Sequence, residues 1–236
     1  MKFLYKRIVL KISGEVINGI NTSNTENHIL YTIAKDIKYL LSHGIEISIV
    51  IGGGNLFRGA SLSKFGINKV TADYIGMLST VINGLFFKDV LNKFNISVCL
   101  MSSIFMHTMC DSYNLDKAKN LLSNSVVVIF CGGIGNPFFT TDSAACVRAI
   151  EINAEIVLKG TKVNGIYSDD PCNSTDVMFY KNLNYQDVLN QEFKIMDLTA
   201  FSLARDHNIP ICIFNINNKK SLIRVLLGKD EGTLVS

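Results

Sequence analysis

The stretch Gly132-Gly133-Ile134-Gly135-Asn136-Pro137-Phe138-Phe139-Thr140-Thr141-Asp142-Ser143 lies between two short apolar segments of the chain. The segment before it, residues 126–130, is β-branched and apolar, which is typical of a fully buried strand. The segment after it, residues 144–150, is predicted to be a helix. In open α/β sheets, ligands bind where a strand ends and the chain turns toward a helix. We therefore interpret this stretch as a ligand-binding loop.

The residue types in the loop indicate what it would bind. Glycines allow the backbone to approach a ligand closely, and the two threonines offer hydroxyl and N–H groups at a helix start. Phe138 and Phe139 are unusual in a polar loop unless a ligand stacks on them. Asp142 also has a purely structural interpretation, because an aspartate at this position can cap the helix.

The rest of the chain alternates between predicted strands and predicted helices. Apolar runs predict strands at residues 7–12, 45–51, 96–101, 156–158 and 211–214, in addition to 126–130. Apolar residues at helical spacing predict helices around residues 29–41, 77–86, 116–122, 197–207 and 219–227. This alternation predicts an α/β fold: an open, largely parallel sheet with helices on both faces, in one domain with two lobes.

The composition excludes several classes of protein. With 48% apolar and 18% charged residues, the 236-residue chain is typical of a soluble globular protein. The net charge of +3 includes no basic block, so we expect no nucleic-acid partner. The six cysteines form no C-x-x-C pair and are expected to be buried, reduced thiols. No signal peptide and no run of ~18 apolar residues is visible, so we expect a cytoplasmic protein without a membrane partner.

The glycine-rich strand ends do not match the common nucleotide-binding fingerprints. The dinucleotide pattern fails because Phe57 and Phe138 stand where its third glycine belongs. The Walker pattern beginning at Gly54 fails because Ala60 replaces its lysine. The loops nevertheless combine positive and negative side chains, which suits a polyphosphate accompanied by a divalent cation. These residues are Lys11, Arg58, Lys159 and Lys162, with Asp142, Asp169 and Asp170.

Single residues in these loops allow two interpretations. Lys11 at a strand exit, followed by Ser13-Gly14, can project its ammonium over the sheet edge, but it can also be a surface lysine. Arg58, which follows a triple glycine, has the same ambiguity. Asp73, near a predicted helix start, can be a helix cap.

Four motifs of the chain, taken together and in order, resemble the bacterial UMP kinases of the amino acid kinase family. The motifs are Lys11-x-Ser13-Gly14-Glu15, Gly52-Gly53-Gly54-Asn55-x-x-Arg58-Gly59, Gly135-Asn136-Pro137-Phe138-Phe139-Thr140-Thr141-Asp142 and Thr161-Lys162-Val163-x-Gly165-x-Tyr167-x-x-Asp170-Pro171. The resemblance runs from about Lys6 to the C-terminus. Other kinases of the fold share the glycine motifs, whereas the Asn136–Asp142 run is narrower and indicates UMP.

The resemblance implies phosphoryl transfer from ATP to UMP, giving UDP and ADP in pyrimidine nucleotide synthesis. It also implies Mg²⁺ bound with ATP, a homohexamer, and one amino acid kinase-like domain over residues 1–236. An acceptor-binding lobe would cover about residues 1–150, and an ATP-binding lobe about residues 151–236.

The same resemblance assigns roles residue by residue. Lys11 would act at the ATP phosphates and Asp142 would orient it, while no residue is assigned as a direct metal ligand. The implied ATP-binding residues are Lys11, Ile12, Ser13, Gly14, Gly54, Arg58, Thr161, Tyr167 and Asp170. The implied UMP-binding residues are Gly53, Asp73, Ile134, Gly135, Asn136, Pro137, Phe138, Phe139, Thr140 and Thr141.

The chain departs from the family pattern in three places. Residues 18–24 replace a segment that is glycine-rich in relatives, and Asn164 replaces a common aspartate. In the region where relatives carry Arg and His for GTP activation, this chain has Lys88, Asn92 and Cys99. We therefore expect weak GTP activation.

Two other functions fit parts of the same pattern. One is a kinase of this fold that phosphorylates a carboxylate or carbamate, which would have no need of the Phe138-Phe139 pair. The other is a non-catalytic nucleotide sensor or DNA-binding regulator on the same scaffold. The presence of both Lys11 and Asp142, and the lack of a basic helix, count against the regulator.

Overall fold

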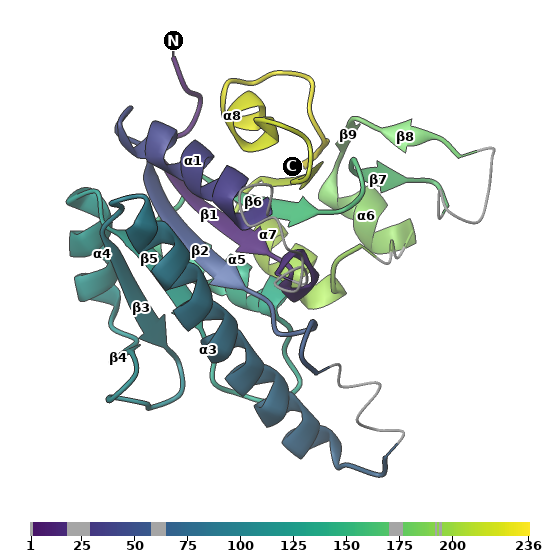
Figure 1. The fold of residues 1–236 in the computed structure, drawn as a ribbon. Coiled ribbons are helices and arrows are strands. Elements are labelled where there is room, and N and C mark those ends of the chain that lie inside the picture. The colour runs from purple at the N-terminus through teal and green to yellow at the C-terminus, as the bar shows by residue number, and fades with distance from the viewer. Residues whose placement is uncertain (1, 18–28, 58–64, 170–176, 192, 194) are drawn as a thin grey trace.

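The centre of the molecule is a twisted, mostly parallel nine-stranded sheet covered by helices on both faces (Figure 1). The computed structural model describes residues 2–17, 29–57, 65–169, 177–191, 193 and 195–236. The strand order is β4-β3-β5-β2-β1-β6-β10-β11-β9, and β10–β11 is the antiparallel pair within it. The α/β fold class predicted from the sequence is confirmed.

The strands of this sheet are β1 (Arg7–Ile12), β2 (Glu46–Ile51), β3 (Val98–Ser102), β4 (Asp111–Ser112), β5 (Val127–Cys131), β6 (Ile156–Thr161), β9 (Asn182–Leu183), β10 (Ile211–Asn215) and β11 (Thr233–Val235). A separate antiparallel hairpin pairs β7 (Ile166–Tyr167) with β8 (Phe179–Tyr180). The helices are α1 (Ile29–Leu41), α3 (Lys69–Lys93), α4 (Leu115–Ser123), α5 (Thr141–Ile152), α6 (Tyr185–Gln191), α7 (Leu198–Asp206) and α8 (Ser221–Leu226), with a 3₁₀ turn, η1 (Gly14–Val16).

Two apolar cores lie on opposite faces of the sheet. Helices α1, α3 and α8 pack on the face that is nearer the viewer in Figure 1 and share one core with alternate residues of the strands. Helices α4, α5, α6 and α7 pack on the other face and form the second core. Because both faces are covered, the central strands β1, β2, β5 and β6 are buried at nearly every position and mostly apolar, rather than alternating between apolar and polar residues.

The longer elements lie where the apolar patterns predicted them, but α3 is longer than its pattern. The apolar stripe covered residues 77–86, whereas the helix extends over Lys69–Lys93. The helix begins earlier because the Asn68 side chain accepts a hydrogen bond from the Val70 N–H at 2.8 Å and caps it. Asp73 therefore lies in the second turn of α3, and its interpretation as the cap is wrong.

Several short elements had no detectable sequence pattern. Strands β4, β7, β8, β9 and β11 have only two or three residues each, which is too short to show alternation. Helix α6 is also short, and its position was not predicted. These elements lie at the edges of the main sheet or in the hairpin outside it, so the predicted centre of the fold is unaffected.

Two further expectations concern α3 and the cysteines. By length and composition α3 could cross a membrane, but the core helix of a soluble protein passes the same test, and α3 packs on the sheet.

Among the described cysteines, Cys99, Cys110, Cys131, Cys146 and Cys212 are free thiols, and all but Cys99 are buried. The expectation of buried, reduced thiols is confirmed for those four; Cys172 lies outside the described residues.

Candidate active site

Three buried charged side chains meet at the carboxyl ends of the central strands. Lys11 on β1 and Lys159 on β6 are register partners on neighbouring parallel strands. Asp142, in the first turn of α5, lies between their ammonium groups: Lys11 Nζ is 2.7 Å from its Oδ1 and Lys159 Nζ is 2.5 Å from its Oδ2. Each of the three residues is less than a tenth exposed.

The electrostatics of this trio favour an anionic ligand. Burial by itself would raise the pKa of Asp142, but the charges of Lys11 and Lys159 hold that pKa below its ordinary value. Burial and the nearby charge of Lys11 lower the pKa of Lys159, and Asp142 opposes this shift. With both lysines protonated, the trio carries one net positive charge in a site with little access to water. A phosphate group placed there would balance that charge.

The sequence analysis counted Lys159 among the loop cations that suit a polyphosphate, without assigning it an individual role. Besides Asp142, its ammonium group donates to the Ile195 carbonyl, so it also ties β6 to the segment before α7. A lysine at the end of an apolar strand, like Lys11, was the available signal. The partnership of the two lysines depends on strand order and register, which the local sequence does not contain.

The loops after β1 and β2 pack against each other without space for side chains. A Cβ on Gly14 would lie 2.6–2.8 Å from atoms of Asn55, Gly52 and Gly54, and a Cβ on Gly53 would lie 2.5 Å from the Gly76 carbonyl oxygen. Gly54, by contrast, is exposed and has open space around its Cα. Glycine is therefore required by packing at positions 14 and 53, whereas Gly54 leaves room for a ligand to approach.

Asn83 of α3 holds the same loop and was missed by the sequence analysis. Its buried amide donates to the Gly52 carbonyl at 2.7 Å and exchanges two hydrogen bonds with the Asn55 side chain. An asparagine within the mostly apolar run of residues 77–87 was the signal available in the sequence. The amide fixes the end of β2 relative to α3.

The loop after β5 has an unusual backbone conformation. Gly132, Gly133 and Gly135 have φ of +75°, +57° and +87°, a region that glycine enters without strain. Phe138 has φ of +74°, which is rare for a bulky residue, and its N–H donates to Asp73 Oδ2 at 2.8 Å. Strained residues of this kind concentrate at ligand-binding sites.

Thr140, and not Asp142, is the cap of α5. The Thr140 hydroxyl oxygen accepts from the Asp142 N–H at 3.0 Å and donates to Asp197 at the start of α7. Ser143 also donates to Asp197, at 2.8 Å. The interpretation of Asp142 as a cap is therefore wrong, and its carboxylate is available to the two lysines.

A cavity of about 180 Å³ lies beside the trio, between the loop after β2, the start of α3 and the loop after β5. It is lined by Gly53, Gly54, Phe57, Lys69, Ala72, Asp73, Gly76, Met77, Thr80, Gly133, Phe138, Phe139, Thr140 and Thr141. We call it the acceptor cavity. Six of the residues assigned to UMP by resemblance line it, namely Gly53, Asp73, Phe138, Phe139, Thr140 and Thr141.

Other assigned residues lie near the acceptor cavity without lining it. Ile134, Gly135, Asn136 and Pro137 belong to the same loop but are not part of the cavity wall. Lys69, by contrast, lines the cavity although the sequence analysis did not single it out, and its ammonium pairs with Asp73 Oδ1 at 2.7 Å.

The residues assigned to ATP follow β1 and β6. Lys11, Ile12, Ser13 and Gly14 are consecutive, and Ile12 is fully buried. The Thr161 hydroxyl bonds within its own turn, to the Val163 carbonyl at 2.8 Å. Tyr167 on β7 packs against Phe179, with ring centroids 5.2 Å apart. Arg58 and Asp170 lie outside the described residues.

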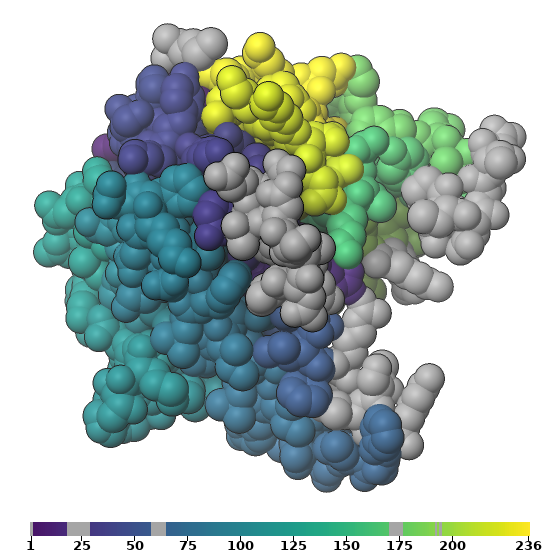
Figure 2. Space-filling view, in the orientation of Figure 1, coloured from purple at the N-terminus to yellow at the C-terminus, as the bar shows by residue number. Residues whose placement is uncertain are grey.

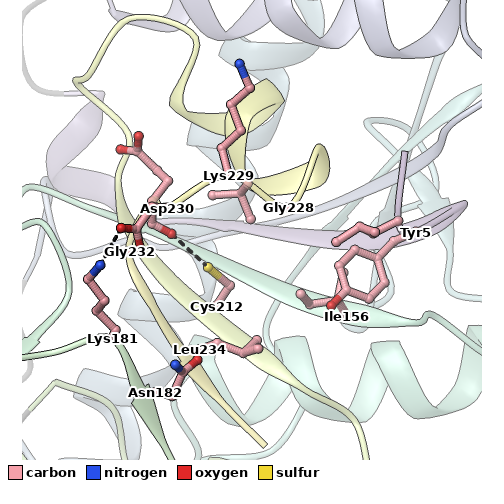
Figure 3. A pocket seen from close by; sticks show the side chains of 13 residues that line it. Tyr5, Ile156, Lys181, Asn182, Cys212, Gly228, Lys229, Asp230, Gly232 and Leu234 are labelled. Carbon is pink, nitrogen blue, oxygen red and sulfur yellow. Dashed lines mark hydrogen bonds and ion pairs between the residues drawn. The ribbon is translucent and has the colours of Figure 1, made fainter. Parts of the chain in front are cut away.

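A cavity of about 320 Å³ lies away from this site, and Figure 3 shows it. Its lining includes Tyr5 and Ile156, at the amino-terminal ends of β1 and β6, and the turn from Gly228 to Gly232. Lys181 and Asp230 form an ion pair in its wall. The buried lysine–aspartate trio and the glycine-rich strand ends belong to the opposite ends of the strands, so we place the candidate active site there.

A parallel α/β sheet with a buried Lys-Asp-Lys trio and glycine loops at its carboxyl edge defines a phosphoryl-transfer class of protein. The sequence matches the Amino acid kinase family over residues 6–215, so the chain belongs to that family.

Individual relatives of the chain indicate the activity more specifically. The chain is 56% identical to the uridylate kinase of Buchnera aphidicola subsp. Schizaphis graminum, over 99% of this chain and 98% of that one. It is similar to the crystal structure of UMP kinase from Bacillus anthracis, with a TM-score of 0.92, 40% identity and coverage of 98% and 96%. It is also similar to UMP kinase from Ureaplasma parvum, with a TM-score of 0.89, 33% identity and full coverage of both chains.

Proposed function

We propose that the chain transfers the γ-phosphoryl group of ATP to UMP, giving UDP and ADP in pyrimidine nucleotide synthesis. The observation that carries this proposal is the buried trio of Lys11, Asp142 and Lys159 beside the acceptor cavity. Thr140 and Thr141 line the cavity and directly precede Asp142, so an acceptor phosphate held by the threonines lies next to the two lysines. The names of the similar proteins support UMP as the acceptor.

The reaction needs positioning and charge neutralisation rather than a general base. The second pKa of a nucleoside monophosphate is near ~6, so at pH 7 its phosphate oxygen is already a nucleophile. That oxygen attacks the γ-phosphorus of ATP, and the bond to the β–γ bridging oxygen breaks as ADP leaves. Charge on the transferred group is then stabilised by the ammonium groups of Lys11 and Lys159, which Asp142 holds side by side.

Mg²⁺ would accompany ATP, and the donor set of the site indicates how it would be held. The described residues contain no group of three His, Cys, Asp or Glu side chains that could hold a metal ion. Both oxygens of Asp142 are engaged by lysines. A Mg²⁺ ion supplies charge neutralisation on the phosphates, and because it commonly uses phosphate and water ligands, we assign it no direct protein ligand.

The two substrates would divide the chain into two lobes. In this arrangement residues 1–150 provide the acceptor cavity, and residues 151–236 provide the Thr161–Tyr167 side of the ATP site. β1 of the first lobe pairs with β6 of the second, so Lys11 and Lys159 face both substrates from one continuous sheet.

We also propose that the chain is a cytoplasmic homo-oligomer, a hexamer by its resemblance to the family. Helix α3 supports self-association because it presents a stripe of exposed apolar side chains at helical spacing: Tyr74, Leu78, Ile82 and Leu85. In Figure 2 this helix forms a strip of the near surface of the molecule. A second copy that covers the stripe would remove these side chains from water.

The direct test of the activity is ADP release from ATP and Mg²⁺ in the presence of single nucleoside monophosphates. We expect turnover with UMP and none of comparable rate with AMP or GMP. Equal turnover of CMP and UMP would remove the uracil assignment, and comparable turnover of a purine nucleotide would contradict the proposal. Phosphorylation of a carboxylate or carbamate, with none of UMP, would favour the alternative kinase.

A further inference from the structure

Arg148 of α5 is a buried cation that the proposed mechanism does not use. It is 4% exposed, and its guanidinium lies over the Tyr113 ring with the central carbon 3.6 Å from the ring centroid. It donates to Glu151 through Nη1, while its Nε has no hydrogen-bond partner among the described residues. An incompletely satisfied buried charge is weak as a source of stability. Its position therefore calls for another explanation.

The Nη2 group of Arg148 is connected by hydrogen bonds to the loop after β5. Arg148 Nη2 donates to Ser103 Oγ at 2.8 Å, and the same hydroxyl donates to the Gly133 carbonyl oxygen at 2.8 Å. Ser103 thus accepts with its lone pair and donates with its single proton, which fixes the direction of both bonds. Tyr113 donates to Glu151, the acceptor of the Arg148 Nη1 group, at 2.5 Å.

Gly133 is the point at which this chain of hydrogen bonds reaches the acceptor cavity. Gly133 lines the cavity, and its φ of +57° lies in the left-handed region. Because glycine has no Cβ, its own side chain does not restrict the orientation of the next peptide. In a trans peptide the C=O and N–H groups point in opposite directions. Fixing the Gly133 carbonyl on Ser103 therefore also fixes the direction of the Ile134 N–H.

We propose that Arg148 is a positioning residue for the acceptor: through Ser103 it holds the carbonyl of Gly133, and so fixes the backbone of a residue that lines the acceptor cavity. The inference rests on the proposed function, because the acceptor is taken to be UMP. It adds two residues, neither of which contacts the cavity itself. Their contribution is preorganisation, so that the loop does not have to be ordered when the nucleotide binds.

The first experiment removes the Ser103 hydroxyl, which connects Arg148 to the Gly133 carbonyl. For Ser103→Ala we expect the dissociation constant of UMP, measured by calorimetry without ATP, to rise about fivefold, as for loss of one ordinary hydrogen bond. The KM for ATP should stay within about twofold, since these hydrogen bonds end at the loop after β5, which borders the acceptor cavity. The matched control is Ser48→Ala, which removes a buried hydroxyl-to-carbonyl bond of 3.0 Å to Ile8 within the sheet.

The second experiment tests whether Arg148 acts through Ser103. Lysine in Arg148→Lys keeps the charge but has no planar fork to serve Glu151 and Ser103 at once. We expect weaker UMP binding in this variant, and no further weakening in the double variant with Ser103→Ala. Additive effects, or a KM for ATP that rises in parallel, would overturn the positioning role.

The outcomes separate the two proposals. If the unmodified protein binds UMP and Ser103→Ala binds it equally well, the role of Arg148 fails and the proposed function stands. If the unmodified protein does not bind UMP, both fail. If Arg148→Lys does not fold, the comparison of Ser103→Ala with Ser48→Ala still decides the matter.

Discussion

At the scale of single residues, Lys11 is the side chain on which the proposed chemistry depends most. In Lys11→Ala we expect turnover to fall by roughly 10²–10³, the scale for loss of one group that stabilises the transition state. The fold should persist, because Asp142 keeps its ion pair with Lys159. Turnover with ATP and UMP is the measurement, and thermal unfolding checks the fold. Lys181→Ala, at the remote cavity, is the control, and a folded Lys11→Ala enzyme with unchanged turnover would contradict the role.

A second residue-scale prediction concerns stability and pH. Burial raises the pKa of Asp36 on α1 from 3.8 to about 6, although Lys220 and Arg224 partly oppose the shift. A carboxyl whose pKa is higher in the folded state than in the unfolded state lowers the free energy of unfolding when it is ionised. This loss of stability disappears as the pH falls from about 6 to about 4, because the carboxyl becomes protonated. Asp36→Asn should therefore stabilise the protein at pH 7.

Urea unfolding of both proteins at pH 7 and pH 4 tests this prediction. The gain in the free energy of unfolding for Asp36→Asn should be present at pH 7 and largely absent at pH 4. A gain of the same size at both values would show that ionisation of Asp36 is not its source.

At the scale of elements, the start of α3 connects stability to the acceptor cavity. Asn68 caps the helix, and Lys69 and Asp73 in its first two turns line the cavity. Asn68→Ala should lower the free energy of unfolding by about 1 kcal/mol, as is usual for loss of a cap. Because fraying of these turns displaces Lys69 and Asp73, the KM for UMP should also rise.

The control for this prediction is another helix cap. The Asn184 side chain accepts from the Asp187 N–H at 2.8 Å at the start of α6, which does not line the acceptor cavity. Asn184→Ala should cost similar stability and leave the KM for UMP unchanged. Equal changes of KM in both variants would mean that general destabilisation, and not the start of α3, affects UMP.

At the scale of the whole molecule, the exposed stripe of α3 predicts how copies associate. Ile82, which is 54% exposed, lies within the stripe, and Ile82→Asp would place a charge in a buried interface. We expect light scattering to show a smaller assembly for Ile82→Asp than for the unmodified protein. Met178→Asp, at a residue 63% exposed outside α3, should leave the mass unchanged. An unchanged mass for Ile82→Asp would exclude α3 as the interface.

Regulation by GTP is a further prediction at this scale. Where the family resemblance places the effector, Lys88 keeps a charge, whereas Asn92 and Cys99 provide none. Each lost charge-assisted hydrogen bond is worth about 1.5–3 kcal/mol, so effector affinity should fall by well over tenfold. We expect initial rates at subsaturating ATP to be nearly the same with and without millimolar GTP. A several-fold activation that saturates at micromolar GTP would contradict this.

The longer strands and helices, and the places where ligand loops leave the sheet, could be predicted from local sequence patterns. These features are local, because apolar periodicity follows from which side of each element is buried. The roles expected for Lys11 and Asp142 came from the family resemblance that the motifs carry, and the structure places these two side chains together. The resemblance carried by the same motifs is confirmed by relatives similar over the full chain.

Which distant residues act together became visible from the three-dimensional arrangement of the elements. Lys159 meets Lys11 because β1 and β6 are neighbours in a register that no local pattern specifies. Thr140 caps α5, and the carboxylate of Asp142 is held by lysines from two different strands. Asn83 and Lys69 of α3 also contribute to the site, and Ser103, 45 residues before Arg148, joins that arginine to the loop after β5. Such partnerships depend on strand order and helix packing, which are fixed by burial over the whole chain rather than by neighbouring residues.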